Sequence, residues 1–163
     1  MTERAFPNFG VLLAPYLTQV PDDARPRFLA LLERGAAARY RAWAEELPEH
    51  AAVLGACSAR EDEIADRIEA VFDIDPAALE KAQAALPGAR DTYYAVFDAM
   101  PVWEQLRTQA DAERQGAAAW RSIAGRVQDP TVLAALAACS ALEEESARVI
   151  DALVDARTGA ATA

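Results

Sequence analysis

Apolar and small residues recur every three or four positions along four segments of this 163-residue chain, covering about 22–47, 49–72, 101–127 and 130–156. This spacing is that of one face of an α-helix. We therefore expect four helices, each turning one apolar stripe toward a shared core. Pro26 stands early in the first segment, and its regular helix should begin near that residue.

Each of the four stripes contains a single charged residue, and it is always a glutamate. In chain order the stripes are Leu29, Glu33, Ala36, Tyr40, Trp43 and Leu47; Leu54, Cys57, Glu61, Ile64, Ile68 and Val71; Trp103, Leu106, Ala110, Glu113, Ala117, Trp120, Ala124 and Val127; and Val132, Leu136, Cys139, Glu143, Ser146, Ile150 and Leu153. The pattern predicts that four carboxylates meet inside the protein. Buried carboxylates are costly unless they are paired, protonated or bound to a cation.

The sequence also repeats itself. The stretch ACSAREDEIADRIEAVF at 56–72 returns as ACSALEEESARVIDALV at 138–154, and residues 17–40 align with 97–120 without a gap. The alignment places Glu33 on Glu113, Tyr40 on Trp120 and, after a two-residue insertion, Glu61 on Glu143. Self-similarity on this scale indicates two copies of one helical unit. Each half, about 9–72 and 89–154, should be a short segment followed by a helical hairpin.

Turn signals separate the helices. ELPEH lies between the first two and QDPTV between the last two, where Asp129 should cap a helix that starts at Pro130. In the connector, Asp75 should cap a short helix at about 76–86, which Pro87-Gly88 should end before another helix at about 89–99. We expect one domain over 1–156 and a disordered tail, RTGAATA, over 157–163.

Composition narrows the function classes. Apolar residues make up 53% of the chain and the formal charge is −10, so nucleic acid and anionic membrane surfaces are unsuitable partners. No leader peptide or membrane-length apolar run is visible, which makes cytoplasmic the expected location. Cys57 and Cys139 lie on apolar stripes and should be buried, reduced thiols without a bridge.

The glutamate pattern resembles the ferritin-like superfamily, and its rubrerythrin-type members most. The resemblance rests on the repeat and on Glu33 and Glu113, each followed seven residues later by an aromatic, Tyr40 and Trp120. It implies an all-α, ferritin-like four-helix bundle, built from two pseudo-symmetric hairpins with a long crossover between the second and third helices. It further implies two iron or manganese ions between the helices and chemistry with oxygen or peroxide.

The chain departs from that family where the second helix of each pair should carry Glu-x-x-His. Here the motifs are Glu61-x-x-Ile64 and Glu143-x-x-Ser146, and the only histidine, His50, belongs to the first interhelical turn, where we expect a surface or capping role. The remaining candidate metal ligands are Glu33, Glu61, Glu113 and Glu143, with Tyr40 behind them. Oxygen-only ligand sets suit hard cations, so an all-carboxylate iron or manganese site is the first hypothesis.

Two alternatives stay open. The chain is equally compatible with a metal-free ferritin-like bundle that acts as a structural, partner-binding or ligand-binding protein. A simpler alternative places the four glutamates at stripe edges, where they reach out to water or pair with basic residues: Arg39, Arg60, Arg114 or Arg148. Motifs of other enzyme classes are missing from the sequence, including GxSxG, a Walker loop and HExxH. The aromatic stretch at 91–103 should be core or a homodimer contact rather than an active-site lid.

Overall fold

The computed structural model describes residues 5–161, and within them the protein is all-helical, with six α-helices, two 3-10 turns and no strand. The α-helices are α1 (Phe9–Leu17), α2 (Arg25–Glu46), α3 (Ala51–Val71), α4 (Pro76–Ala95), α5 (Val102–Ala124) and α6 (Pro130–Ala161). The 3-10 turns are η1 (Asp22–Ala24) and η2 (Pro48–His50). The expected all-α class is confirmed. None of these helices is long and apolar enough to cross a membrane.

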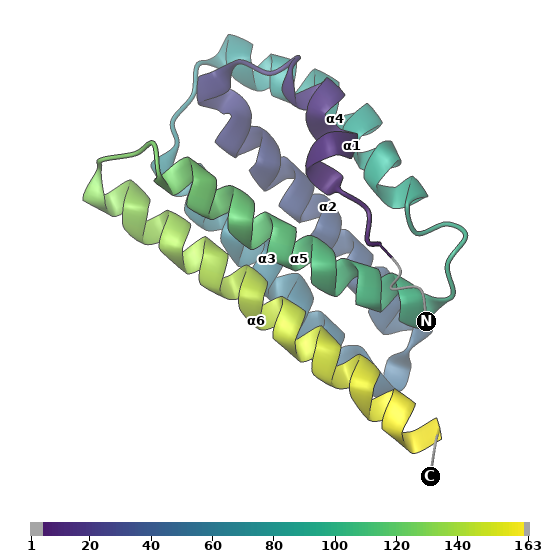
Figure 1. The fold of residues 1–163 in the computed structure, drawn as a ribbon. Helices are drawn as coiled ribbons and strands as arrows, with labels where there is room; N and C mark the ends of the chain where they lie inside the picture. Colours follow the sequence, from purple (N-terminus) through teal and green to yellow (C-terminus); the bar gives the residue numbers. More distant parts are fainter. Residues whose placement is uncertain (1–4, 162–163) are drawn as a thin grey trace.

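The four long helices α2, α3, α5 and α6 form two hairpins that lie side by side (Figure 1). In each hairpin the helices run antiparallel, and α3 packs against α6. The predicted start signals are in place: Pro26 lies in the first turn of α2, and the Asp129 side chain accepts hydrogen bonds from the first backbone N–H groups of α6 at 2.8 and 3.1 Å. Every residue of the four predicted stripes is buried or half-buried.

Ion pairs on the two hairpins follow the internal repeat. In the first hairpin, Arg41 of α2 lies 3.0 Å from Asp62 of α3. In the second, Arg121 of α5 lies 2.5 Å from Glu144 of α6. The alignment of the two sequence halves pairs these arginines with each other and these acids with each other. The repeated sequence therefore specifies a repeated helix–helix contact.

A buried serine repeats in the same way. The hydroxyl of Ser58 donates to the carbonyl oxygen of Ala37 at 2.9 Å, and that of Ser140 donates to the carbonyl oxygen of Ala117 at 2.6 Å. Each serine follows the cysteine of its half. Because a buried hydroxyl must find a partner, this bond holds the two helices of each hairpin close together.

The connector differs from the expectation. A single helix, α4, runs through Pro87-Gly88, so the short helix at 76–86 does not end there and the separate helix at 89–99 does not exist. Gly88 serves close packing instead of a turn: a Cβ atom at this position would lie 2.6 Å from the ring of Tyr16. The Tyr16 hydroxyl is 2.6 Å from the hydroxyl of Thr92, one turn further along α4.

The first helix, α1, was not predicted. It is short and apolar on most sides, and it contains Pro15, so it shows no stripe of its own. It packs along α4, where the ring of Phe9 lies 5.4 Å from that of Tyr93 (Figure 1). Its place in the repeat corresponds to the end of α4, because the offset that aligns 17–40 with 97–120 places 9–17 on 89–97, although these two stretches share no identical residue.

At the other end, α6 continues to Ala161, so the segment expected to be a disordered tail is helical as far as that residue. Residues 162–163 lie outside the described part of the chain. One contact that favours the longer helix is Arg157, whose guanidinium lies 4.6 Å from the centre of the Trp103 ring.

Candidate metal centre and its cavity

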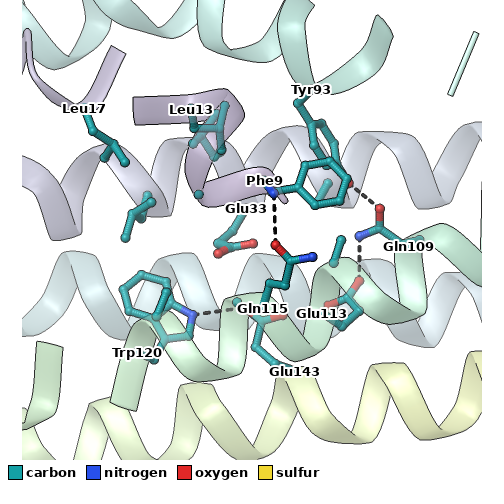
Figure 2. Close-up of a pocket in the computed structure, with 17 residues that line it drawn as sticks. Phe9, Leu13, Leu17, Glu33, Tyr93, Gln109, Glu113, Gln115, Trp120 and Glu143 are labelled. Carbon is teal, nitrogen blue, oxygen red and sulfur yellow. Dashed lines mark hydrogen bonds between the residues drawn. The ribbon is translucent and has the colours of Figure 1, made fainter. Parts of the chain in front are cut away.

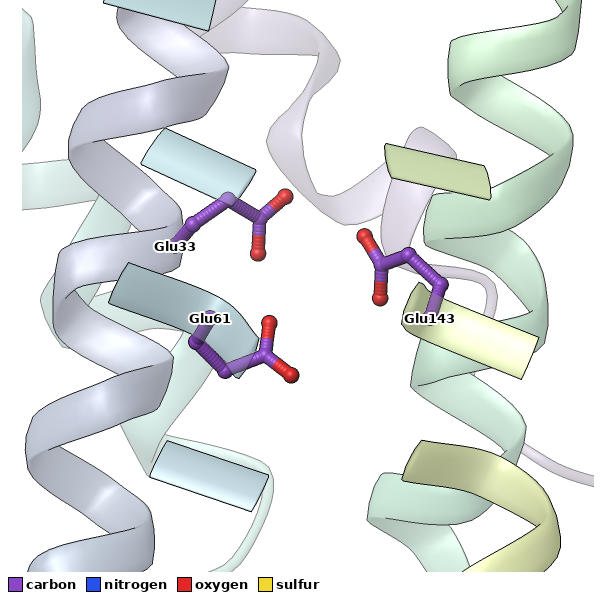
Figure 3. A group of neighbouring side chains, drawn as sticks. All are labelled: Glu33, Glu61 and Glu143. Carbon is purple, nitrogen blue, oxygen red and sulfur yellow. The ribbon is translucent and has the colours of Figure 1, made fainter. Parts of the chain in front are cut away.

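Three glutamates from three helices come together in the interior. Glu33 of α2, Glu61 of α3 and Glu143 of α6 each offer a carboxylate oxygen, and these oxygens lie within 4.8 Å of one another. Figure 3 shows Glu33 and Glu61 on one side, facing Glu143 across the space between the hairpins. This spacing is short enough for a single cation to contact all three carboxylates.

Glu113 of α5 is the fourth acid. Its Oε1 atom accepts one hydrogen bond from the Tyr40 hydroxyl at 2.5 Å and another from Gln109 Nε2 at 2.7 Å. The contact between Tyr40 and a core glutamate is therefore present as predicted. The charge of Glu113 is among the causes that raise the pKa of each of the other three glutamates, so its carboxylate lies near theirs, although the group within 4.8 Å contains only Glu33, Glu61 and Glu143.

Glu143 is held against α5. Its Oε1 accepts a hydrogen bond from Trp120 Nε1 at 2.9 Å. A Cβ atom added to Gly116 would lie 2.5 Å from the same oxygen. The absence of a side chain at this position allows the carboxylate to lie directly against the helix backbone.

Glu61 is fully buried and incompletely bonded. Its Oε1 accepts a hydrogen bond from the Ser146 hydroxyl at 3.3 Å, while no donor among the described residues reaches Oε2. Ser146 in turn accepts a hydrogen bond from Arg60 Nε at 3.0 Å. A buried carboxylate oxygen without a donor is unfavourable unless a proton or a cation compensates it.

The edge-of-stripe alternative fails for the arginines that it named. Arg114 pairs with Asp151 and Arg148 with Glu145. Arg39 packs its guanidinium on aromatic rings, 4.7 Å from that of Phe97. Arg60 approaches the acids only through Ser146. Within the described residues, none of these arginines forms an ion pair with a core glutamate.

Burial and mutual repulsion change the proton affinity of the acids. Burial, followed by the charge of Glu113, raises the pKa of Glu33 from 4.5 to about 8. Burial likewise raises the pKa values of Glu61 and Glu143 well above their usual range, and the neighbouring carboxylates add to the effect. In the absence of a cation the cluster therefore retains protons at neutral pH.

A partly enclosed cavity of about 210 Å³ opens on one side of the cluster (Figure 2). Phe9, Leu13 and Leu17 of α1 form one wall, and Glu33, Glu113 and Glu143 are among the residues opposite. Further lining residues are Leu29, Leu32 and Ala36 of α2, Tyr93 of α4, and Gln109, Ala112, Gln115, Gly116, Ala119 and Trp120 of α5.

Tyr93 connects this cavity to the acids. Its hydroxyl donates to Gln109 Oε1, and Gln109 donates to Glu113. The aromatic stretch at 91–103 is core at Phe97, as expected, but at Tyr93 it contributes to the site, which the sequence analysis missed. The sequence did contain one indication of this polar connection. Gln109 precedes Glu113 by one helical turn and hence shares its face of the helix.

The cysteines and the histidine do not contribute ligands. Cys57 and Cys139 are buried and free, as predicted, and burial raises their pKa values to about 11 and about 12. His50 lies at the end of η2, half-buried, with its ring edge-on to Trp103 at 5.4 Å. Carboxylates are thus the only metal-ligating groups gathered at the site within the described residues.

Comparison with known proteins assigns no family. No protein-family model matches the chain, and neither the curated proteins nor the solved structures contain a significant match. The functional argument therefore depends on the residues and their geometry.

Proposed function

We propose that this protein is a ferritin-like metal protein that holds iron or manganese on Glu33, Glu61, Glu113 and Glu143. The observation that carries the proposal is the unpartnered, fully buried Oε2 atom of Glu61, which lies in a cluster of carboxylates. A divalent cation would compensate this oxygen and remove the repulsion among the acids in one step.

The chemistry of the ligands sets the class of metal. Four carboxylates supply only hard oxygen ligands, which suit manganese, ferrous iron, magnesium and calcium better than zinc or copper. Four negative charges balance two divalent ions. Among these metals the ferritin-like resemblance favours iron or manganese, and it makes oxygen or peroxide the reactant to test first.

The hairpin repeat supports the ferritin-like part of the proposal. In such a bundle each hairpin contributes one acid per helix to a site on the pseudo-two-fold axis. Here Glu33 and Glu61 come from one hairpin, and Glu113 and Glu143 from the other. The residues at the two histidine positions do not replace the lost ligands, since Ile64 is apolar and Ser146 already bonds Glu61.

Metal analysis tests the proposal. Protein purified without chelators should contain iron or manganese, and adding Mn²⁺ to chelator-treated protein should raise its melting temperature. A ligand that binds only the folded state stabilises it by about 2.7 kcal/mol at one hundred times its dissociation constant. Glu61→Gln should abolish this stabilisation. Glu144→Gln is the matched control, because Glu144 is exposed and adjoins Glu143 in sequence.

The opposite pattern would support a metal-free bundle. In that case Mn²⁺ would leave the melting temperature unchanged. Glu61→Gln and Glu143→Gln would leave stability equal or higher near neutral pH, because each removes a buried acid that has no cation to compensate it.

A further inference from the structure

The cavity beside the acid cluster has the size and lining of a small-molecule site. Its volume of about 210 Å³ exceeds the roughly 150 Å³ of an engineered apolar cavity that takes up benzene. Leucines from α1 and α2 line much of it, together with the rings of Phe9 and Tyr93. It therefore has room for one aromatic ring or a short alkyl chain.

The polar groups of the cavity wall that are free to bind a ligand are mainly hydrogen-bond acceptors. The donor-bearing side chains are Tyr93, Gln109, Gln115 and Trp120. Each of their donor atoms already bonds an acceptor within the protein. The acceptors include the carboxylates of Glu33, Glu113 and Glu143, and among residues 5–161 no lysine, arginine or histidine lines the cavity. What the wall offers a ligand is therefore hydrogen-bond acceptors, together with carboxyl groups that have no positive counter-charge until a cation binds.

We propose that this cavity binds a small primary amine, with its apolar body beneath α1 and its ammonium group at Glu33, Glu113 and Glu143. An ammonium group supplies both the positive charge and the donors that the wall lacks. Glu61 does not line the cavity, but its carboxylate, which has an unpartnered oxygen, belongs to the same cluster as those of Glu33 and Glu143.

This inference goes beyond the proposed metal site, because it concerns the space that borders the carboxylates and not the metal between them. The two ligands use the same acids. Amine binding should consequently weaken when Mn²⁺ is bound, and the reverse holds by thermodynamic linkage.

Benzylamine is a suitable probe, with benzyl alcohol and benzoate as ligands of matched size. Titration calorimetry on the chelator-treated full-length chain should show binding of benzylamine at millimolar concentration or below. Benzyl alcohol should bind more weakly, and benzoate about tenfold or more weakly than the amine, because a second anion would face the carboxylates. Equal binding of benzoate and benzylamine, or no binding of benzylamine, would overturn the proposal.

Substitutions at two neighbouring alanines of α5 test whether the amine binds in this cavity. Ala119 lines the cavity, whereas Ala118 is exposed. Ala119→Phe should fill the cavity and weaken benzylamine binding about tenfold, while Ala118→Phe should change it by less than about twofold. If Ala119→Phe does not fold, Ala112→Leu fills the cavity from the preceding part of α5. Unchanged affinity in a folded cavity-filling variant would contradict the assignment.

The amine titration distinguishes this inference from the metal proposal, since it is carried out in chelator. Loss of benzylamine binding leaves the Mn²⁺ measurements unaffected, and failure of Mn²⁺ to bind leaves the amine result unaffected.

Discussion

The two hairpins share their supporting contacts and differ at the site between them. The ion pairs Arg41–Asp62 and Arg121–Glu144 occupy equivalent positions, and so do the serine bonds that join the helices of each hairpin. Three residues after Glu61 and Glu143 the hairpins diverge, with Ile64 in one and Ser146 in the other. The repeat thus preserves the scaffold, while the polar network inside it is asymmetric.

The aromatic residues show the same asymmetry. Tyr40 of the first hairpin donates across to Glu113 of the second, whereas Trp120 donates to Glu143 within its own hairpin. Equivalent positions therefore bond different acids. The repeat gives the two hairpins equivalent acids and aromatic residues, but it does not dictate which donor stabilises which carboxylate.

The largest effect should come from these aromatic positions. Trp120→Ala and Tyr40→Ala each remove a fully buried ring and a donor to a carboxylate. Each should cost about 3–5 kcal/mol of unfolding free energy, measured by urea denaturation. The half-buried Trp103 is the control, and Trp103→Ala should cost clearly less. A cost below 1 kcal/mol for either core ring would contradict the described packing.

A pH dependence should follow in the chelator-treated protein. Glu33 keeps its proton up to about pH 8 when folded, while its ordinary pKa is 4.5. The folded state therefore binds more protons between these values, and its stability is lost as pH rises through that window. The slope should be about 1.4 kcal/mol per pH unit for each extra proton.

Glu33→Gln provides the control for this slope, because glutamine does not titrate. The variant should show a flatter decline in unfolding free energy between pH 5 and pH 8. A wild-type protein that becomes more stable as pH rises from 6 to 8 would argue against a protonated cluster.

Two helix glycines, one against the acid cluster and one away from it, give a matched pair of substitutions. Gly116→Ala should push the Glu143 carboxylate away from α5 and destabilise the protein by about 1 kcal/mol, even though alanine favours helix. Gly55→Ala is the matched control, since nothing lies within 4 Å of its added Cβ atom. It should stabilise the protein by about 0.5–1 kcal/mol in thermal unfolding. Equal effects at both glycines would mean that Glu143 does not lie against Gly116.

The smallest effect concerns the repeated ion pairs. Arg41→Ala and Arg121→Ala each break an ion pair in which the arginine is exposed to solvent. Arg41 also donates a hydrogen bond to the Ser58 hydroxyl at 2.8 Å. Arg121→Ala should cost about 0.5 kcal/mol or less in urea denaturation, and Arg41→Ala slightly more because it also removes a donor to Ser58. A large difference would show that the hairpins are less alike than their equivalent contacts indicate.

Much of the architecture could be predicted because its signals are local. The three–four spacing indicated the faces of α2, α3, α5 and α6, and the two caps before proline marked helix starts. The same spacing identified all four acids. Glu61, for example, occupies the same stripe position as Glu143, and both are buried.

What sequence could not provide depends on contacts between distant segments. Pro87-Gly88 has the form of a helix stop, but the Tyr16 ring of α1 packs where a Cβ would stand. The α1 helix lacks a polar face, so periodicity gave no warning of the cavity beneath it. Ser146 was visible in the sequence as a polar residue on the apolar stripe of α6, yet its link from Arg60 to Glu61 exists only once α3 and α6 are packed together.

The central claim is that one cation site lies among Glu33, Glu61, Glu113 and Glu143. Its most direct test is a crystal of the full chain grown with Mn²⁺ and measured at the manganese absorption edge. We predict an anomalous peak between these four carboxylates, which disappears in Glu61→Gln crystals grown in the same way. A map of well-ordered wild-type crystals with no anomalous peak among the four glutamates would contradict the account.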